Sequence, residues 1–513
     1  MKNIFTFIII ATCLSSFGQQ GGTLDVSFGS SGSVTTDFSG TDGSGYKTAL
    51  QSDGKILVVG DAYNPNPLSQ FAISRYNVDG SLDLTFGVGG KVLTSVGTIS
   101  SIAYSLQVQP DGKIVVVGCA MNSAGTNWNF ALVRYDSFGV LDNTFGIGGK
   151  VMSTISLGST AYDLFLRPDG KIVACGTAFN GSYHSFAVAR YNVDGSLDNS
   201  FGSNGQVIIH PGTGSGAALG MGEQSTGHIV LSGYTTNGSN LEIAMVRFDS
   251  LGVLDNTFGV SGIALTSIGG TQNIANDIAI EIDDKIILVG RTNNGGLFDF
   301  AVLKYNVNGT LDNTFGTNGY VITSIDISND NALGVAIESN GRIIVAGNYM
   351  NSANKQNIAI MNYNNDGSIN SNFGVNGKVM TQIGSSHCNA NSVVLQSDGK
   401  IIIAGRIYNG TNNDFLVARY NNLDDLSLFE GDIDNTLSIF PNPIISCSTI
   451  HFDEFQENTL FKIADINGKE IKSSYFSGQE LLFIRDENLE SGSYFFEFID
   501  RQNKKVIKKV SIQ

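Results

Sequence analysis

Three ionisable residues, Lys47, Asp163 and Asp277, are the strongest candidates for chemistry in this sequence. Each lies in a short alternating run just before a tight turn, at a position that other parts of the chain fill with Ser or Gly. Two carboxyl groups at a set separation can act as the acid and the base of glycoside hydrolysis. The alternative is that all three are solvated side chains without chemistry, so that alanine at both Asp163 and Asp277 leaves binding and stability nearly unchanged.

Other residue patterns that carry chemistry are not found in the sequence. The five histidines share no spacing, and no CxxC or Cys-His cluster suggests a metal. There is also no Gly-rich phosphate loop, nucleophile elbow or calcium loop. We therefore expect no metal, no cofactor and no catalytic residue that a motif could assign.

The elements that must position the three candidates are repeats. The phrase RYNVDGSLDLTFG, which begins at Arg75, returns five times with changes, the last copy being the decayed NYNNDGSINSNFG. Its LDxxFG motif recurs every 56 to 59 residues, starting with an extra copy at Leu24. Such a fixed period is the signature of a repeat architecture. A catalytic residue is needed once and a packing residue once per repeat, so the phrase is interpreted as structural.

Each repeat contains four short β-like runs, of the types AYSLQVQ, KIVVVG, FALVRY and GKVLT, and shows no helical period. The Asp-Gly turn between the first two runs is a hairpin signal. Seven such units predict an all-β fold, a seven-bladed β-propeller over residues 24–421, with a β-solenoid as the alternative. The first run of each unit is expected to be innermost, which would place Lys47, Asp163 and Asp277 along the central channel.

The ends of the repeat array predict how the ring closes. In five repeats a Lys or Arg is followed eight residues later by Asp, as in Arg75 and Asp83, and in the sixth repeat Asn replaces both residues. The seventh repeat has Arg419 without its Asp, whereas the unused copy at Leu24 supplies Asp25. A propeller must hide its open edge strands. We therefore expect Ser33–Thr36 to pair with Phe415–Tyr420, and Asp25 to lie near Arg419 in an ion pair worth about 0–1 kcal/mol if it is exposed.

The segment ALQSDGKILVVG…FAISRYNVDGSLDLTFG resembles the delta-60 repeat, a propeller repeat of bacterial secreted proteins. The resemblance covers all seven units. It implies the architecture, and it brings no catalytic residues that could be transferred to this chain.

Export is predicted by the first residues. Residues 1–18 combine Lys2, a short apolar run and small residues before Gln19, as in a cleaved signal peptide; a lipid anchor at Cys13 is the alternative. The formal net charge of −16 argues against nucleic acid as a partner, because phosphate rewards Lys and Arg. No later apolar run is long enough for a transmembrane helix.

A different pattern begins after Tyr420. Residues 422–436 are interpreted as an acidic linker, and residues 437–513 as a small β-sandwich domain of alternating runs. This domain resembles the C-terminal sorting domain of type IX secretion cargo. The residues that carry the resemblance are Pro441, Asn442, Pro443, Gly468, Gly492 and Tyr494. It implies that the type IX machinery is a partner, and that the protein is secreted or attached to the outer-membrane surface. An ordinary ligand-binding sandwich is the alternative.

Two functions remain open from the sequence. The first is an exported, non-catalytic propeller that acts at the cell surface as a scaffold or as a binding module for an unidentified partner or glycan. The second is a polysaccharide-active hydrolase with its site at the channel mouth. Propellers host both kinds of function, so the fold does not decide between them.

Overall fold

The computed structural model describes residues 21–38, 40–64, 68–422, 437–440, 444, 447–464, 470–485, 489, 492–499 and 505–512. The chain divides into two compact units, Met1–Leu423 and Asp424–Gln513. The predicted signal peptide and nearly all of the predicted linker lie outside the described residues. The part of the chain that the structure describes contains no helix long and apolar enough to cross a membrane.

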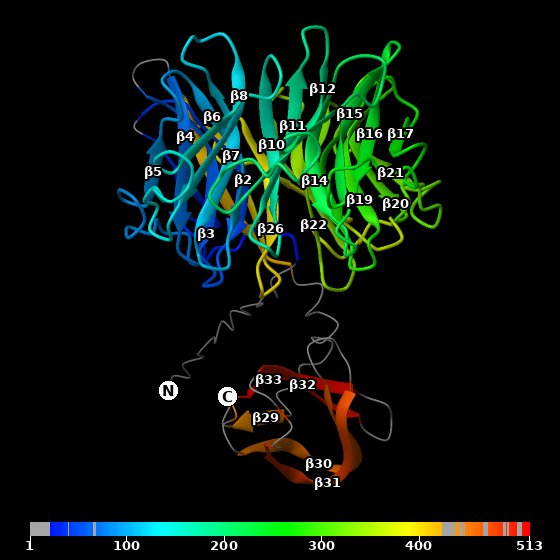
Figure 1. Cartoon of the computed structure of the whole chain (residues 1–513). Helices are drawn as coiled ribbons and strands as arrows, with labels where there is room; N and C mark the ends of the chain where they lie inside the picture. Colours follow the sequence, from blue (N-terminus) through cyan, green and yellow to red (C-terminus); the bar gives the residue numbers. More distant parts are fainter. Residues whose placement is uncertain are drawn as a thin grey trace, which may run out of the picture. The chain divides into compact units, whose positions relative to one another are not determined.

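The first unit is a ring of seven four-stranded antiparallel sheets, so the predicted seven-bladed β-propeller is confirmed (Figure 1). The innermost strands are β2 (Gly43–Leu50), β6 (Ser101–Val108), β10 (Ser159–Leu166), β14 (Gly216–Glu223), β18 (Asn273–Ile280), β22 (Asp330–Ile337) and β26 (Cys388–Leu395). The second strands are β3 (Ile56–Asn64), β7 (Ile114–Met121), β11 (Ile172–Phe179), β15 (Ile229–Asn237), β19 (Ile286–Asn294), β23 (Ile343–Met350) and β27 (Ile401–Tyr408).

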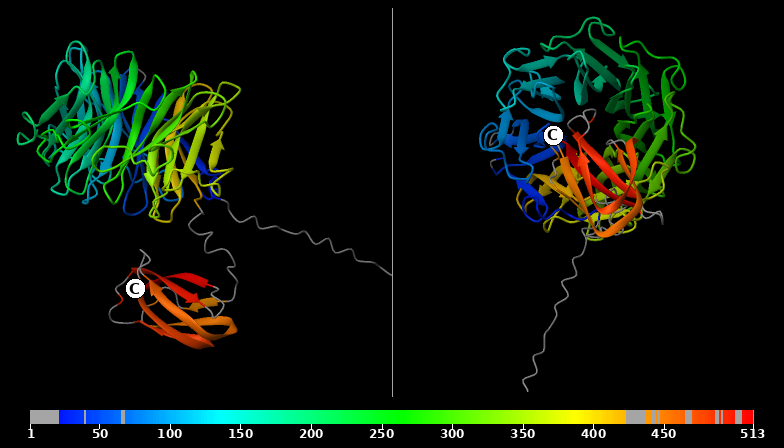
Figure 2. Two further views of the ribbon diagram at one scale, coloured as in Figure 1. Left: turned by 90° about the vertical axis from the view of Figure 1, so that its right-hand side faces the viewer. Right: turned by 90° about the horizontal axis from the view of Figure 1, so that it is seen from below.

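The outer half of each blade follows in the same order. The third strands are β4 (Leu68–Tyr76), β8 (Trp128–Tyr135), β12 (His184–Tyr191), β16 (Asn240–Phe248), β20 (Leu297–Tyr305), β24 (Gln356–Tyr363) and β28 (Asn413–Tyr420). The outermost strands are β5 (Lys91–Thr94), β9 (Lys150–Ser153), β13 (Gln206–Ile209), β17 (Ile263–Thr266), β21 (Tyr320–Thr323), β25 (Lys378–Thr381) and β1 (Ser33–Thr36). Figure 2 shows the blades arranged around one axis.

The two ends of the propeller differ in their connections. The tight turns between first and second strands and the repeated phrase after the third strand lie at one end, which we call the turn face. The loops between second and third strands, and those leading to the next blade, lie at the other end, which we call the loop face.

The ring closes as the sequence predicts. Strand β1 pairs with β28, with Ser33 opposite Ala418 and Thr36 opposite Phe415, and completes the seventh blade. Asp25 Oδ2 accepts from Arg419 Nε and from Lys400 Nζ, both at 2.8 Å. The side chains of Asp25 and Arg419 are only 3% and 5% exposed. The contribution of about 0–1 kcal/mol expected for an exposed ion pair therefore does not apply. Removing one partner of a buried pair typically costs about 3–5 kcal/mol.

The recurring phrase joins each blade to the next. Four of the predicted pairs form at 2.7–2.8 Å, namely Arg75–Asp83, Arg134–Asp142, Arg190–Asp198 and Arg247–Asp255. The guanidinium group of Arg75 also stacks 4.5 Å from the ring centre of the buried Phe86, and donates to the carbonyl of Ser137 in the next blade. One Arg thus contacts a carboxylate, an aromatic ring and a backbone carbonyl of the next blade. It can do so because its guanidinium group is planar and carries several hydrogen-bond donors.

The fifth pair, Lys304 with Asp312, does not form as predicted. Lys304 Nζ lies 2.8 Å from Glu281 Oε2, and among the described cations Asp312 keeps only Lys285, at 2.9 Å, as Asp198 keeps Lys171 beside its Arg. A Lys ammonium is a single point charge on a flexible stem and cannot hold several acceptors in one plane. The site therefore loses only the direct pair with Asp312 when Arg becomes Lys, because Arg75 and Arg247 also contact the residue equivalent to Glu281.

The buried aspartates of this motif predict acid sensitivity. Burial alone would raise the pKa of Asp83, but hydrogen bonds from Thr85 and the charges of Arg75 and Lys55 lower it to about 2. A carboxyl group whose pKa is lower in the folded than in the unfolded state stabilises the fold above the unfolded value and loses that effect as pH falls. We expect the melting temperature to fall steeply between about pH 4 and pH 2, as followed by circular dichroism. A melting temperature independent of pH in this range would contradict the assignment.

A bulge in every innermost strand explains an invariant glycine. In β10 the register shifts between Ala161 and Asp163, which leaves Tyr162 as an extra residue, and the same shift occurs in the other six blades. Opposite the bulge, a Cβ atom on Gly176 would lie 1.9 Å from the carbonyl oxygen of Thr160. Only glycine fits at this position, which ends each KIVVVG-type run.

The second unit confirms the predicted small β domain. Its strands are β29 (Leu437–Phe440), β30 (Cys447–Ala464), β31 (Glu470–Ile484), β32 (Gly492–Ile499) and β33 (Lys505–Ile512). They follow the order β29-β30-β32-β33, with β31 also paired to the long β30. Phe452, Phe461, Phe496 and Phe498 are buried at its centre with Ile463.

Candidate functional site

The three sequence candidates are brought together at the centre of the propeller. Lys47 on β2 lies with its Nζ 3.2 Å from Asp277 Oδ1 on β18. The charge of Lys47 also acts on Asp163 of β10. Among the described residues, no group of three or more His, Cys, Asp or Glu is arranged to hold a metal ion.

Hydrogen bonds between blades occupy both carboxylates. Asp163 Oδ1 accepts from Ser105 Oγ of the second blade at 2.8 Å, and its Oδ2 accepts from Met221 N of the fourth blade at 3.1 Å. Asp277 Oδ2 accepts from Val335 N of the sixth blade at 3.0 Å. Each aspartate therefore fastens its own innermost strand to a neighbouring one.

The interpretation of these aspartates as solvated groups is wrong. Asp163 and Asp277 are each only 8% exposed. Burial raises the pKa of Asp163, an effect that the charge of Lys47 opposes and that of Asp277 reinforces. The sequence could not show this, because the donors Met221 N and Val335 N belong to the backbone of other repeats.

Stability is expected to depend on Asp277. Alanine there leaves the buried amide of Val335 without its acceptor and Lys47 without its ion partner, which should cost about 1–3 kcal/mol. Asparagine can still accept from Val335, so Asp277→Asn should lose less. Urea unfolding of the two variants beside the wild type measures the difference. Unchanged stability in Asp277→Ala would show that the bonds of Asp277 to Val335 and Lys47 do not stabilise the fold.

Nearer the loop face, three tyrosines form an arc around the axis. Tyr46, Tyr104 and Tyr162 are the bulged residues of the first three innermost strands. Their neighbouring ring centres are 5.3 and 5.1 Å apart, and all three side chains are half-buried. Burial raises the pKa of each phenol, to about 12 for Tyr162, so the hydroxyl groups remain protonated. We call these residues the tyrosine arc.

The bulge position differs in the remaining blades. Leu219, Asn276, Leu333 and Asn391 fill it. Asn276 donates to Asn331 Oδ1 at 2.9 Å, and Asn391 donates to the carbonyl of Gly45 at 2.7 Å. One side of the ring therefore presents aromatic faces, and the other side presents amides and leucines.

A second variable ring accompanies the first. The residue after the invariant glycine of each second strand is Asp61, Cys119, Thr177, Tyr234, Arg291, Asn348 or Arg406. Burial raises the pKa of Asp61, against the hydrogen bonds that it accepts from Ser69 and Tyr46. The charge of Arg406 acts on both Tyr46 and Asp61, which links the seventh blade to the tyrosine arc.

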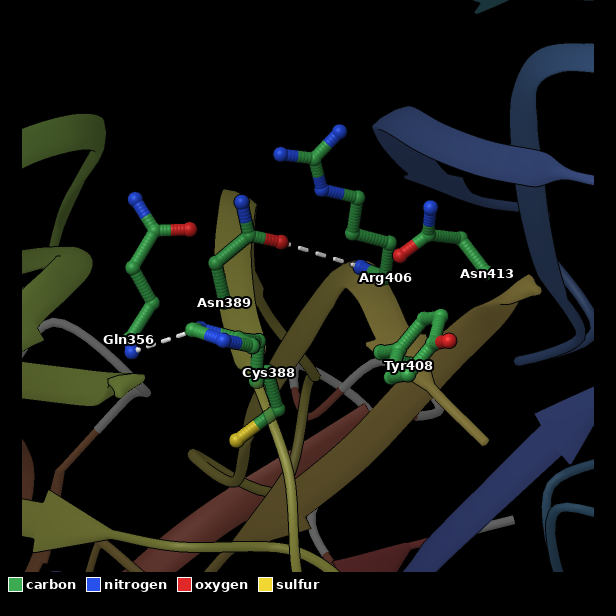
Figure 3. A pocket seen from close by; sticks show the side chains of 7 residues that line it. Gln356, Cys388, Asn389, Arg406, Tyr408 and Asn413 are labelled. Atoms are coloured by element: carbon green, nitrogen blue, oxygen red, sulfur yellow. Dashed lines mark hydrogen bonds between the residues drawn. The ribbon is translucent and has the colours of Figure 1, made fainter. Parts of the chain in front are cut away.

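A pocket of about 200 Å³ lies at the loop-face ends of the sixth and seventh blades. We call it the blade 6–7 pocket; its lining residues are Gln356, His387, Cys388, Asn389, Arg406, Tyr408 and Asn413. Figure 3 shows the polar ends of Gln356, Asn389 and Arg406 directed to the same side. The backbone amide of Gln356 donates to His387 Nδ1 at 3.1 Å, so a neutral His387 carries its proton on Nε2.

Sequence reasoning missed the tyrosine arc and the blade 6–7 pocket. It compared the repeats only at the position of Lys47, whereas the residue just before it and the residue after the invariant glycine vary as much. Aligning every position of the seven repeats would have found the tyrosine arc and the variable residues that follow the invariant glycine. The pocket also needs His387 from a connecting loop, which no repeat pattern predicts.

Of the predicted sorting residues, Pro441, Asn442, Pro443 and Gly468 lie outside the described residues. Gly492 begins β32, where it pairs with Ile512, and Tyr494 pairs with Val510 and packs against the core. Cys119, Cys175 and Cys388 of the propeller are free and buried.

Comparison with known families finds two matches. The family described as a domain of unknown function (DUF5122) beta-propeller matches residues 51–86, 109–145, 167–201, 224–258, 283–315, 338–373 and 396–425. The secretion system C-terminal sorting domain matches residues 438–513. A search of curated proteins found no match.

Solved structures with a similar shape share little sequence with this chain. Virginiamycin B lyase from Staphylococcus aureus is 14% identical, with 75% of this chain and 98% of that chain covered at a TM-score of 0.42. The polysaccharide lyase Uly1 is 10% identical over 74% and 90%, at 0.43. PorZ of Porphyromonas gingivalis, a surface component of the type IX secretion system, is 9% identical over 91% and 81%, at 0.25.

Proposed function

Since this chain is a secreted protein with seven DUF5122 β-propeller repeats and a type IX C-terminal sorting domain, we propose that its propeller is a non-catalytic binding module at the cell surface. Its ligand, a surface glycan or partner, binds on the loop face over the tyrosine arc and the blade 6–7 pocket. The sorting domain directs the protein to the type IX machinery and to the outside of the cell.

One observation supports the binding role above the others. The blades differ in residue type around the loop-face end of the axis, where Tyr46, Tyr104 and Tyr162 present half-buried rings. Aromatic faces beside amide and guanidinium groups suit recognition, because each combines apolar contact with a fixed polar tip. The carboxylates that acid–base chemistry would need, Asp163 and Asp277, are already bound within the fold.

The alternative is a polysaccharide-active hydrolase at the same end of the axis. Asp61 favours it, because burial raises the pKa of this carboxyl group and Tyr46 of the arc donates to it. A raised pKa suits a general acid. This reaction also needs a second carboxyl group as base or nucleophile, and the release of reducing ends from a polysaccharide would establish the alternative.

The binding role is tested with the full chain and a panel of purified cell-surface polysaccharides. Replacing Tyr104 and Tyr162 by alanine should weaken binding about tenfold or more, since each 1.4 kcal/mol of lost contact is a factor of ten. The matched control is Phe138→Ala, an aromatic residue 60% exposed on the turn face. Equal binding by the double variant and the wild type would contradict the proposal.

A further inference from the structure

We infer that the blade 6–7 pocket binds one acidic sugar residue and that Arg406 holds its carboxylate. The inference rests on the proposed binding role and names the class of ligand. It is carried by the size of the pocket, the unused donors of Arg406 and the polar groups around it.

The pocket has the size of one sugar ring. Its volume of about 200 Å³ corresponds to about seven water molecules in the liquid. Pockets for larger organic ligands usually measure about 300–1,000 Å³. A single residue at the end or side of a glycan chain therefore fits, and the rest of the chain can continue toward the tyrosine arc.

Arg406 is not required by the fold. The corresponding residue is Asp61, Cys119 or Thr177 in the first three blades. The backbone amide of Arg406 donates to Asn389 Oδ1 at 3.1 Å, and Figure 3 shows the guanidinium group directed away from that bond. By contrast, Arg75, Arg134, Arg190, Arg247 and Arg419 all pair with aspartates.

Within the described part of the chain, no carboxylate lies at ion-pair distance from Arg406. A planar guanidinium group with free donors matches the two oxygens of a carboxylate. The chain has a formal net charge of −16, so acidic partners for an arginine are plentiful. An arginine in a pocket without such a partner is therefore available to an anionic ligand.

Two carboxylates near the pocket, those of Asp42 and Asp61, already accept hydrogen bonds. Asp42 Oδ1 accepts from the backbone amide and the side-chain amide of Asn413, at 2.8 and 3.0 Å. Asp61 accepts from Ser69 Oγ at 2.6 Å, and burial raises the pKa of its carboxyl group while the charge of Arg406 opposes that shift. Neither carboxylate is at ion-pair distance from Arg406, although the charge of Arg406 does act on Asp61, so the guanidinium donors stay open to an anion.

The other lining groups suit sugar hydroxyls. Asn389 and Gln356 each carry a side-chain amide with both donors and acceptors, and His387 has a donor on Nε2 when neutral. Tyr408 donates its hydroxyl to the carbonyl of Gly410 at 3.0 Å. That bond fixes the ring at the side of the pocket, where it can cover an apolar face of the sugar.

The test measures binding of the full chain by calorimetry to a panel of hexuronates and sialic acid, each beside its carboxyl-reduced, neutral counterpart. At least one acid should bind about 10- to 100-fold more tightly than its neutral counterpart, the range expected for a charge-assisted bidentate contact. Arg406→Gln should remove this preference. Arg291→Gln, which changes an arginine on the same ring outside the pocket, should keep it.

The outcomes separate this inference from the proposed function. Equal binding of acidic and neutral sugars, no binding of any acid, or a preference that survives in Arg406→Gln overturns the acidic-sugar assignment. The binding role still stands in those cases if the tyrosine variants weaken binding of a polysaccharide. It falls if they do not, whatever Arg406 does. Equal melting temperatures of Arg406→Gln and the wild type exclude misfolding as the cause of a lost preference.

Discussion

A chain that ends before residue 437 is expected to be retained on the inner side of the outer membrane, with its propeller folded. The sorting domain spans residues 438–513, and the propeller belongs to a separate compact unit with its own cores. Removing the tail therefore takes away the signal for the type IX machinery without removing a strand from any blade. Delivery should fall to background, as measured by fractionation and by protease treatment of intact cells.

The control for this truncation is a full chain with Asp277→Ala. This variant is expected to be less stable in the propeller but keeps its tail, so it should still reach the surface. Normal surface delivery of the truncated chain would show that residues 437–513 are not the sorting signal, and would favour the ordinary sandwich domain instead.

Opening the ring is expected to be the most damaging change to the propeller itself. Asp25→Ala leaves Arg419 and Lys400 without their shared carboxylate in a buried site, and should cost about 3–5 kcal/mol. Whole domains are stable by only about 5–15 kcal/mol. The variant should also loosen the N-terminal strand β1, because β1 is an edge strand whose strand partner is β28. Urea unfolding and limited proteolysis measure the two effects.

Asp83→Ala provides the matched control for closure. Asp83 makes the same ion pair with Arg75 and is equally buried, but its neighbouring strands continue along the chain on both sides. It should lose comparable stability without freeing a terminal segment to protease. If Asp25→Ala unfolds at the same urea concentration as the wild type, closure by this pair is wrong.

The repeat made most of the fold predictable from the sequence. A spacing of 56 to 59 residues with four β-like runs is enough for a seven-bladed ring, and the missing Asp after Arg419 is enough to pair the two ends. The predicted pair of Lys304 with Asp312 was wrong because Lys304 binds Glu281 and Asn365 instead. These two residues come close to Lys304 only in the folded chain. Local patterns do not contain that information.

The site was predictable only in part, for a related reason. Lys47, Asp163 and Asp277 do converge, as their shared position in the repeat implies. Their role depends on backbone donors of other blades, so burial and bonding could not be inferred from residue types. The blade 6–7 pocket combines a connecting loop with the second strand of another blade, and its existence follows from packing alone.

The central claim is that the ligand binds on the loop face, around the tyrosine arc. Hydroxyl-radical footprinting of the full chain, with and without the polysaccharide it binds, tests this most directly. We predict that oxidation of Tyr46, Tyr104, Tyr162 and Tyr408 falls in the complex, while that of Phe138 on the turn face is unchanged. Protection of Phe138 with unprotected tyrosines would place the ligand on the turn face and contradict the account.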